Sequence, residues 1–456
     1  MPSLLSLPRE ILHCIFSYTD RQSRKELRLS SKLLSTTGQS WVFQSTKVSR
    51  ERSSCERFQN ILDRPDLASA VTKVYLSTES GNYDPELEQM NLEDGDEYLE
   101  ADEADEDEDS ALPPWFWRVV NRLHQLPRLQ SVVLIFHPDC DGGENDWGDV
   151  QQTTSFRDAV IQKTMSILAS LPRLPRELGI QDLQNINPSD SGVVQDLEKV
   201  LGGVQSLRLN VANELDEGNG ENNVTRAAVH EFFPTLSSFW LKPALGNLEH
   251  LTIYSSIYFG FYPKCDLSNV HLPHLKSLAL GNYTFIHDSQ LEWILSHGET
   301  LQELYLDDCP ILHEVAVDSE TKEQTALDPH TFKTHPRLQH KTHAYYSTRW
   351  ADYLQAFNER LPHLRHFRIG HNPHWWEDDT TPFEREERIR IGFYESYMVY
   401  CDGFGPSQYM KRIIFDMDDG YVDGGVLKPS EDDEAALKRL LGKLGQSVDE
   451  DDDDDY

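Results

Sequence analysis

The sequence lacks the features that mark membrane-spanning and secreted proteins. Its longest strongly apolar run, Val132 to Phe136, is far shorter than the roughly 20 residues that cross a bilayer. The first residues contain Arg9 and Glu10 and lack the uninterrupted apolar core and the small-residue cleavage site of a signal peptide. We therefore expect an intracellular protein of the cytoplasm or the nucleus, with no membrane contact.

Cysteine is also scarce, and the usual catalytic motifs are absent. The six cysteines lie far apart in the sequence, so they indicate neither a disulfide framework nor a CxxC zinc site. The patterns GxGxxG, GxxxxGK[ST], HExxH and GxSxG do not occur, which removes the usual support for dinucleotide, P-loop, zinc-protease and serine-hydrolase chemistry. We expect no cofactor, no bound metal and no enzymatic activity.

Positive charge is in short supply as well. The chain has 42 Lys and Arg against 77 Asp and Glu, a net charge of -35. Because nucleic acids are bound chiefly through Lys and Arg, this balance excludes a nucleic-acid partner. Acids concentrate in residues 84–109 and 431–456, and runs of like charge repel themselves and bury little apolar surface. We expect a disordered acidic insertion at residues 84–111 and an extended acidic tail at residues 431–456.

The first 49 residues have the apolar spacing of a small helical unit. Pro8 stands where a helix tolerates proline, because the first turn leaves that N–H without an intrahelical partner. Apolar residues then recur at helical spacing in two stretches, Ile11, Leu12, Ile15 and Phe16, then Leu27, Leu29, Leu33 and Leu34. A unit this small buries little apolar surface, so we expect a partner protein to cover part of it.

The segments LPREILHCIF, LRLSSKLLS and WVFQSTKVS within residues 1–49 resemble the F-box. The F-box is a three-helix module that binds the Skp-type adaptor of cullin-based ubiquitin ligases, and a downstream domain of such proteins selects the client for ubiquitination. The resemblance implies adaptor contacts through Leu7, Pro8, Ile11, Leu12, Ile15, Phe16, Leu29 and Leu33.

From residue 50 onward an apolar hexad of the form LxxLxL recurs after stretches with helical periodicity. The six hexads begin at Leu129, Val204, Leu248, Leu275, Leu301 and Leu364. The amphipathic stretches cover residues 156–171, 191–201, 224–239, 288–297 and 349–361. Three of the hexads are spaced as in leucine-rich repeats, in which stacked helix–strand units share one core.

The expected fold is therefore mixed α/β. An F-box at residues 1–49 precedes an irregular leucine-rich-repeat-like solenoid at residues 50–430, similar to fungal F-box proteins with degenerate repeats. In each hexad the last two apolar residues should face the core, so the residues between and after them should face the opposite, concave side. The expected client-binding residues are Arg208, Asn210, Thr252, Tyr254, Tyr305, Asp307 and Arg368.

These features predict a non-catalytic substrate receptor of a Skp-cullin-F-box ubiquitin ligase, which binds the adaptor and cullin through the F-box and a client through the array. One alternative is an interaction scaffold or acidic chaperone for basic proteins, outside any ubiquitin ligase. Another is a metal hydrolase that uses a histidine cluster, His330, His335, His340 and His343. No carboxylate stands among these histidines, and lysine and arginine do, which favours an exposed loop. Residues 139–150 have alternating acids like a calcium loop, but Val150 stands where a bidentate Glu is required.

Overall fold

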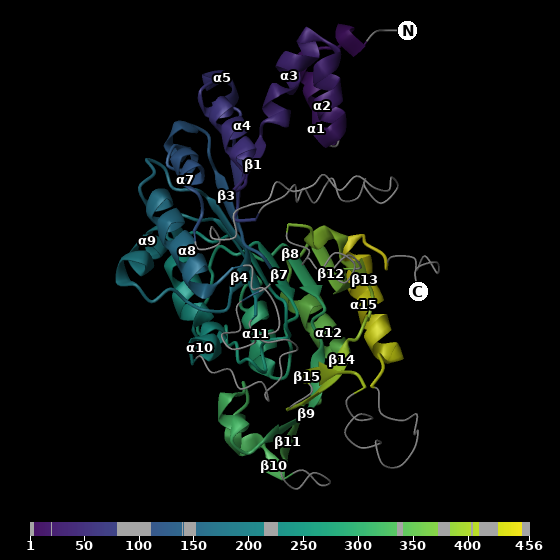
Figure 1. Ribbon diagram of the computed structural model, residues 1–456. Coiled ribbons are helices and arrows are strands. Elements are labelled where there is room, and N and C mark those ends of the chain that lie inside the picture. The colour runs from purple at the N-terminus through teal and green to yellow at the C-terminus, as the bar shows by residue number, and fades with distance from the viewer. Residues whose placement is uncertain are drawn as a thin grey trace, which may run out of the picture. The chain divides into compact units, whose positions relative to one another are not determined.

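The computed structural model describes residues 4–19, 21–79, 111–138, 140, 152–213, 227–334, 341–372, 384–402, 405–409 and 427–448 (Figure 1). They belong to two compact units, the first drawn from Met1–His137 and Gln151–Ile180, the second from Pro138–Val150 and Gln181–Tyr456. None of the helices within the described ranges is both long and apolar enough to cross a membrane.

The first unit begins with a bundle of short helices. In chain order these are the 3₁₀ helix η1 (Leu4–Ser6), α1 (Arg9–Tyr18), α2 (Arg21–Ser30) and α3 (Lys32–Val42). The predicted second helix is in fact two helices, because the chain is extended at Ser31, whose hydroxyl accepts a hydrogen bond from the backbone N–H of Leu34. This cap satisfies one of the free N–H groups at the start of α3 and fixes where that helix begins.

A small apolar core holds these helices together. Leu12 and Phe16 of α1 and Leu34 of α3 are buried against one another. Gly38 lets the two helices approach, because a Cβ atom there would lie 2.5 Å from the ring of Phe16. Three buried side chains form a modest core, as expected for a module of this size.

The rest of the first unit alternates strands with helices. Its strands lie in the order β1 (Ser45–Val48), β2 (Lys73–Ser77), β3 (Ser131–Ile135) and β4 (Glu177–Gln184). Its helices are α4 (Arg52–Leu62), α5 (Pro65–Ala68), α7 (Pro114–Val120), η2 (Leu123–Gln125) and α8 (Thr154–Ala169). Strands β1, β2 and β3 pair in parallel, and every residue of β3 is buried, as expected for a strand covered on both faces.

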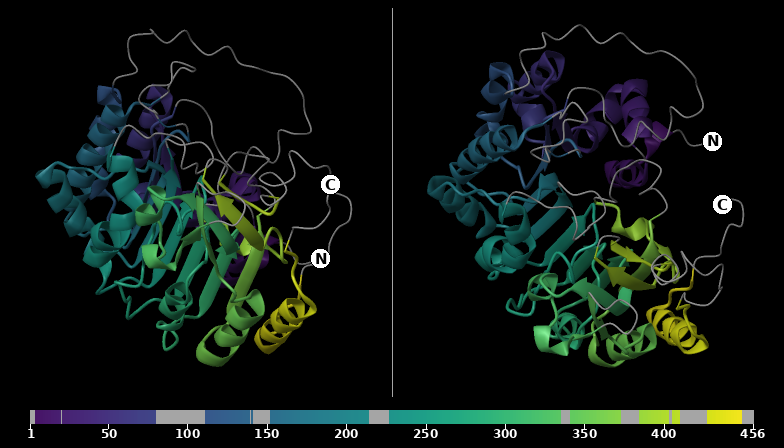
Figure 2. Two further views of the ribbon diagram at one scale, coloured as in Figure 1. Left: turned by 90° about the horizontal axis from the view of Figure 1, so that it is seen from below. Right: turned by 60° about the horizontal axis from the view of Figure 1, so that its bottom comes forward.

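Parallel strands also dominate the second unit. The last residues of β4 precede β5 (Ser206–Ala212), β6 (His250–Ser255), β7 (Ser277–Gly281), β8 (Glu303–Asp307) and β12 (His366–His371), and the short antiparallel strand β13 (Arg390–Ile391) follows in the sheet order. The helices are α9 (Ser191–Leu201), α10 (Ala227–Leu236), the π-helix η3 (Ser237–Leu241), η4 (Lys242–Ala244), α11 (Asp288–Leu295), α12 (Trp350–Arg360), η7 (Glu386–Arg388) and α15 (Glu431–Leu444). Helix α12 contacts α11 and α15. In Figure 2, α12 is the green helix that lies beside the yellow α15.

The amphipathic pattern of α12 shows why these helices pack. Trp350, Tyr353, Leu354 and Phe357 recur at helical spacing and are all buried. The rings of Trp350 and Tyr353 pack edge-on against Phe285. One face of the helix is thus removed from water, which supplies most of the stability of such an element.

A second, smaller sheet belongs to the same unit and was not predicted. Its order is β10 (Lys333–Thr334), β11 (Lys341–Tyr345), β9 (Ile311–Asp318), β14 (Tyr397–Cys401) and β15 (Gly405–Ser407), and η5 (Thr321–Gln324) and η6 (Pro329–Thr331) lie between β9 and β10 in the chain. One face carries a core that includes Phe261, Leu312, Val315 and Tyr400. Two of the four histidines of the predicted cluster are described here. His330 is exposed and His343 is buried in β11, whereas His335 and His340 lie outside the described residues.

The mixed α/β class is confirmed. Each hexad begins two residues before a parallel strand, and the six strands are β3, β5, β6, β7, β8 and β12. The five amphipathic stretches coincide with α8, α9, α10 with η3, α11 and α12. A leucine-rich-repeat solenoid is not confirmed by this arrangement, and the domain limits stay predictions.

The expectation of an extended tail is wrong for residues 431–444, which form α15. The four acids of its first turn, Glu431 to Glu434, lie where the positive end of the helix dipole favours them, and Ser430 and Asp433 form a capping box. The next turns bury Ala436, Leu437, Leu440 and Leu441. Charge and apolar residues thus occupy different positions of one amphipathic helix. Residues 84–110 of the predicted insertion at 84–111, residues 449–456, and residues 139 and 141–150 of the calcium-like stretch lie outside the described residues.

Candidate functional site: an apolar surface on the N-terminal helices

The eight predicted adaptor-binding residues occupy different depths of the N-terminal module. Leu12 and Phe16 belong to its core, and Leu7, Ile15 and Leu33 are partly buried and pack against that core. The remaining three, Pro8, Ile11 and Leu29, are exposed. Within the module, then, one group of the predicted residues holds the helices together and another faces outward.

The outward-facing group is larger than the sequence indicated. The side chain of Ile11 is 46% exposed and that of Leu29 is 83% exposed, and Leu4, Leu5 and Tyr18 are exposed as well. Among the described residues, all the exposed large aliphatic side chains lie in this module. The other exposed large hydrophobic residues are the tyrosines 345, 394 and 409. We call Leu4, Leu5, Ile11, Tyr18 and Leu29 the apolar surface. Apolar residues gathered on one small module are typical of a protein-binding site.

Polar contacts fix how these helices are connected. The Nε of Arg24 in α2 donates a hydrogen bond of 2.8 Å to the carbonyl oxygen of Phe16, and its Nη2 donates to the carbonyl of Ser17. Its guanidinium also lies over the ring of Trp41 in α3, whose Nε1 donates to Nδ1 of His13 at 3.0 Å. A cation beside the last carbonyls of α1 suits the negative end of that helix. Arg24 thereby connects all three helices.

Comparison with known families decides what this module is. Residues 4–40 match the F-box domain. The match takes in α1, α2 and most of α3, and no curated protein matches the chain. F-box domains generally bind Skp-type adaptors, and F-box proteins are typically non-catalytic adaptors. The match does not extend to the parallel strands, so a leucine-rich array and a fungal type stay predictions.

The seven predicted client-binding residues lie together on one face of the second unit's parallel strands. Arg208 pairs in register with Thr252, Asn210 with Tyr254, and Tyr305 with Arg368. Four of them are nevertheless buried, namely Asn210, Thr252, Tyr254 and Asp307, and the client-binding role of the seven stays a prediction. The other three, Arg208, Tyr305 and Arg368, are partly exposed.

The chain itself covers this face. Glu386, in η7, is buried, pairs with the guanidinium of Arg208 and accepts a hydrogen bond of 2.8 Å from the hydroxyl of Thr252. The Nη1 of Arg368 donates a hydrogen bond of 2.6 Å to the carbonyl oxygen of Ile389. Both arginines therefore hold residues 386–389 over the strands, and hexad spacing contains no signal for this return of the chain.

A buried polar cluster occupies the carboxyl ends of β8 and β12. The hydroxyl of Tyr254 donates to Oδ2 of Asp307 at 3.3 Å, and the backbone N–H of Asn372 donates to Oδ1 at 2.9 Å. Burial raises the pKa of Asp307 well above its ordinary value, and the charge of Asp308 raises it further. Beside it, Oδ2 of Asp308 lies 2.7 Å from Nδ1 of His371.

Asp307, Asp308 and His371 are also the described residues best suited by type to hold a metal ion, since their ligand atoms all lie within 4.8 Å of one another. Each, however, is already hydrogen-bonded within the protein, Asp307 to Tyr254 and Asn372, and Asp308 to His371. Buried polar groups that satisfy one another in this way stabilise a core. We therefore assign the cluster a structural role.

Proposed function

We propose that this protein is the substrate-recognition subunit of a Skp-cullin-F-box ubiquitin ligase, has no catalytic activity of its own, and works in the cytoplasm or the nucleus. The supporting observation is the coincidence of the F-box match at residues 4–40 with the apolar surface. The same helices that match the domain expose Ile11 and Leu29, as an adaptor-binding module requires.

Burial of the apolar surface is the source of adaptor affinity in this proposal. Apolar area removed from water contributes about 25 cal/mol per Å². The core beneath that surface consists of only Leu12, Phe16 and Leu34 with partly buried neighbours. A partner that covers the surface binds the folded module and not the unfolded one, and therefore stabilises the folded state.

Client recognition is assigned to the residues that follow the F-box. Arg208, Tyr305 and Arg368 remain candidates because they are partly exposed, and Tyr and Arg are enriched at the energetic centres of interfaces. Arg208 and Arg368 also hold residues 386–389 in place, so replacing either of them would also disturb that segment.

Assembly of the ligase tests the proposal. The full chain is mixed with a purified Skp-type adaptor and a cullin, and the mixture is separated by size. A complex of all three is expected for the parent protein, and Ile11→Asp should release the chain while adaptor and cullin stay together. Tyr409→Asp is the matched control, because Tyr409 is a 48% exposed aromatic residue of the second unit. Separate elution of the parent chain would overturn the proposal.

The alternative, an acidic scaffold or chaperone for basic proteins, is supported by the net charge of -35. It predicts partners that dissociate as salt is raised, since exposed charges more than about 10 Å apart are screened at roughly 0.1 M salt. Adaptor binding through apolar side chains should survive the same salt. The salt dependence of the assembly therefore distinguishes the two functions.

A further inference from the structure

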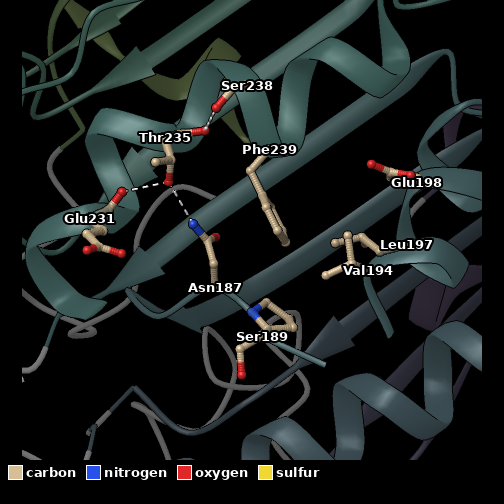
Figure 3. A pocket seen from close by; sticks show the side chains of 10 residues that line it. Asn187, Ser189, Val194, Leu197, Glu198, Glu231, Thr235, Ser238 and Phe239 are labelled. Carbon is tan, nitrogen blue, oxygen red and sulfur yellow. Dashed lines mark hydrogen bonds between the residues drawn. The ribbon is translucent and has the colours of Figure 1, made fainter. Parts of the chain in front are cut away.

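A pocket of about 360 Å³ lies in the second unit between α9 and the end of α10 with η3. Figure 3 shows Val194 and Leu197 of α9 on one side and Phe239 of η3 pointing between the two helices. Asn187, which follows β4, lies between Thr235 above it and Ser189 below it. A volume of this size accommodates one long side chain and matches the lower range of ligand sites.

Hydrogen bonds to a buried tryptophan preform one wall of the pocket. Nε1 of Trp240, which is fully buried, donates to Oδ1 of Asn187 at 2.8 Å. Nδ2 of the same asparagine donates to the hydroxyl of Thr235 at 2.9 Å, and that hydroxyl donates to the carbonyl oxygen of Glu231 at 2.6 Å. The asparagine amide is therefore oriented before any ligand enters, which lowers the entropy that binding must overcome.

The charge of the lining has one sign. Two carboxylates line the pocket, Glu198 from α9 and Glu231 from α10, and no Lys, Arg or His does. Both glutamates are exposed, and neither carboxylate forms an ion pair with any residue in the described ranges. In Figure 3 they stand on opposite sides of Phe239. An apolar side formed by Val194, Leu197 and Phe239, with two exposed carboxylates beside it, matches a side chain that has an apolar stem and a cationic end.

We propose that this pocket binds one arginine or lysine side chain of the client protein. The proposal rests on the proposed client-recognition function and names the chemistry that this surface recognises. The stem packs against Val194 and Leu197, the cation reaches Glu198 or Glu231, and a guanidinium gains a further contact with the face of Phe239. Pairing at an exposed rim contributes modestly, so the pocket adds selectivity for a basic residue to a larger client interface.

Short blocked peptides test the pocket without knowledge of the client. Four tetrapeptides differ only at the second position, which is arginine, lysine, citrulline or glutamate, and citrulline is the neutral isostere of arginine. Each is titrated into the full chain carrying isotope-labelled valine and leucine methyl groups, and the NMR shifts of Val194 and Leu197 report occupancy. The arginine and lysine peptides should move both signals, the citrulline peptide should need a several-fold higher concentration to do so, and the glutamate peptide should leave them in place. The ratio of the two affinities tells which cation the pocket prefers.

Charge-neutral variants complete the test. The double variant Glu198→Gln, Glu231→Gln should weaken the arginine peptide about two- to fivefold, as expected for the loss of a rim ion pair. Asp196→Asn is the matched control, because Asp196 lies on the same helix and does not line the pocket. Equal binding of citrulline, or undiminished binding by the double variant, would overturn the proposal. Adaptor binding by the same proteins is measured in parallel, so failure of the pocket is distinguished from failure of the ligase function.

Discussion

The ring of Tyr254 lies across Gly281. Tyr254 extends from β6, Gly281 stands in β7, and the tyrosine hydroxyl reaches Asp307 in β8, the register partner of Gly281. A Cβ atom on Gly281 would lie 2.2 Å from Cδ1 of the ring, closer than any real contact. Three neighbouring strands are thereby connected by one side chain that passes over the middle strand, and the middle strand needs glycine at that position.

Gly281→Ala should therefore destabilise the second unit. We expect a loss of about 1–3 kcal/mol in the free energy of unfolding, typical of overpacking in a close-packed core. In a Tyr254→Ala background the same change should cost little, because the ring that it meets has been removed. A double-mutant cycle from urea unfolding measures the coupling between the two residues. Equal losses in both backgrounds would contradict the contact.

Because residues 431–444 form a helix with a buried apolar face, a substitution on that face should lower the stability of the protein, although the stretch is rich in acids. Leu440 is fully buried in α15, so Leu440→Ala should lower the free energy of unfolding by about 2–5 kcal/mol. Lys438→Ala, on the exposed side of the same helix, should change it by no more than about 0.5 kcal/mol. Urea unfolding followed by tryptophan fluorescence compares them. If neither substitution changed the free energy of unfolding, this segment would contribute no packing.

A buried histidine should make stability depend on pH. Nε2 of His297 accepts a hydrogen bond from the backbone N–H of Leu272, its Nδ1 lies 2.9 Å from the carbonyl of Trp293, and its ring stacks on His271. Burial, aided by the charge of His271, lowers the pKa of His297 to about 4. A protonated ring could not accept from Leu272, so the folded state favours the neutral form.

Between that value and the ordinary 6.5, the unfolded chain binds the proton and the folded chain does not. Stability from this group is thus complete above pH 6.5 and is lost as pH falls toward 4, by on the order of 3 kcal/mol. His297→Gln should be less stable at pH 7 and should show a flatter dependence over this window. His330→Gln, at an exposed histidine, is the control and should keep the parent slope. Parallel slopes for the parent protein and His297→Gln would refute this.

The sequence predicted the local elements well and their burial poorly. The recurring LxxLxL hexad identified the strands after Leu129 and Leu248, because a buried strand needs apolar side chains wherever it lies in the sequence. The position of Tyr254 was misjudged because its exposure depends on residues far away in the chain. Glu386, which bonds to Thr252 over a separation of 134 residues, covers the same face, and no local pattern encodes that return.

In the F-box, too, the helices could be predicted from the sequence and the burial of individual residues could not. Its helices could be predicted from the spacing of Ile11, Leu12, Ile15 and Phe16 together with the family resemblance. The break at Ser31 was missed, although a serine that caps the next turn is a recognisable signal. Which apolar residues face outward depends on how the helices pack, so the sequence alone does not distinguish the exposed Leu4 and Leu5 from the buried Leu12.

The central claim is that the apolar surface binds a Skp-type adaptor. Calorimetric titration of the full chain with purified adaptor measures this binding directly, and Leu29→Asp is the decisive variant because its side chain is 83% exposed and the helical fold does not need it. Burying an unpaired carboxylate costs several kcal/mol, and each 1.4 kcal/mol is about tenfold in affinity. We predict binding by the parent protein, at least a hundredfold weaker binding by Leu29→Asp, and unchanged helix content by circular dichroism. Apolar burial makes the heat of binding change with temperature, so the titration is run at two temperatures. Absence of heat with the parent protein at both, or equal affinity of the two proteins, would contradict the account.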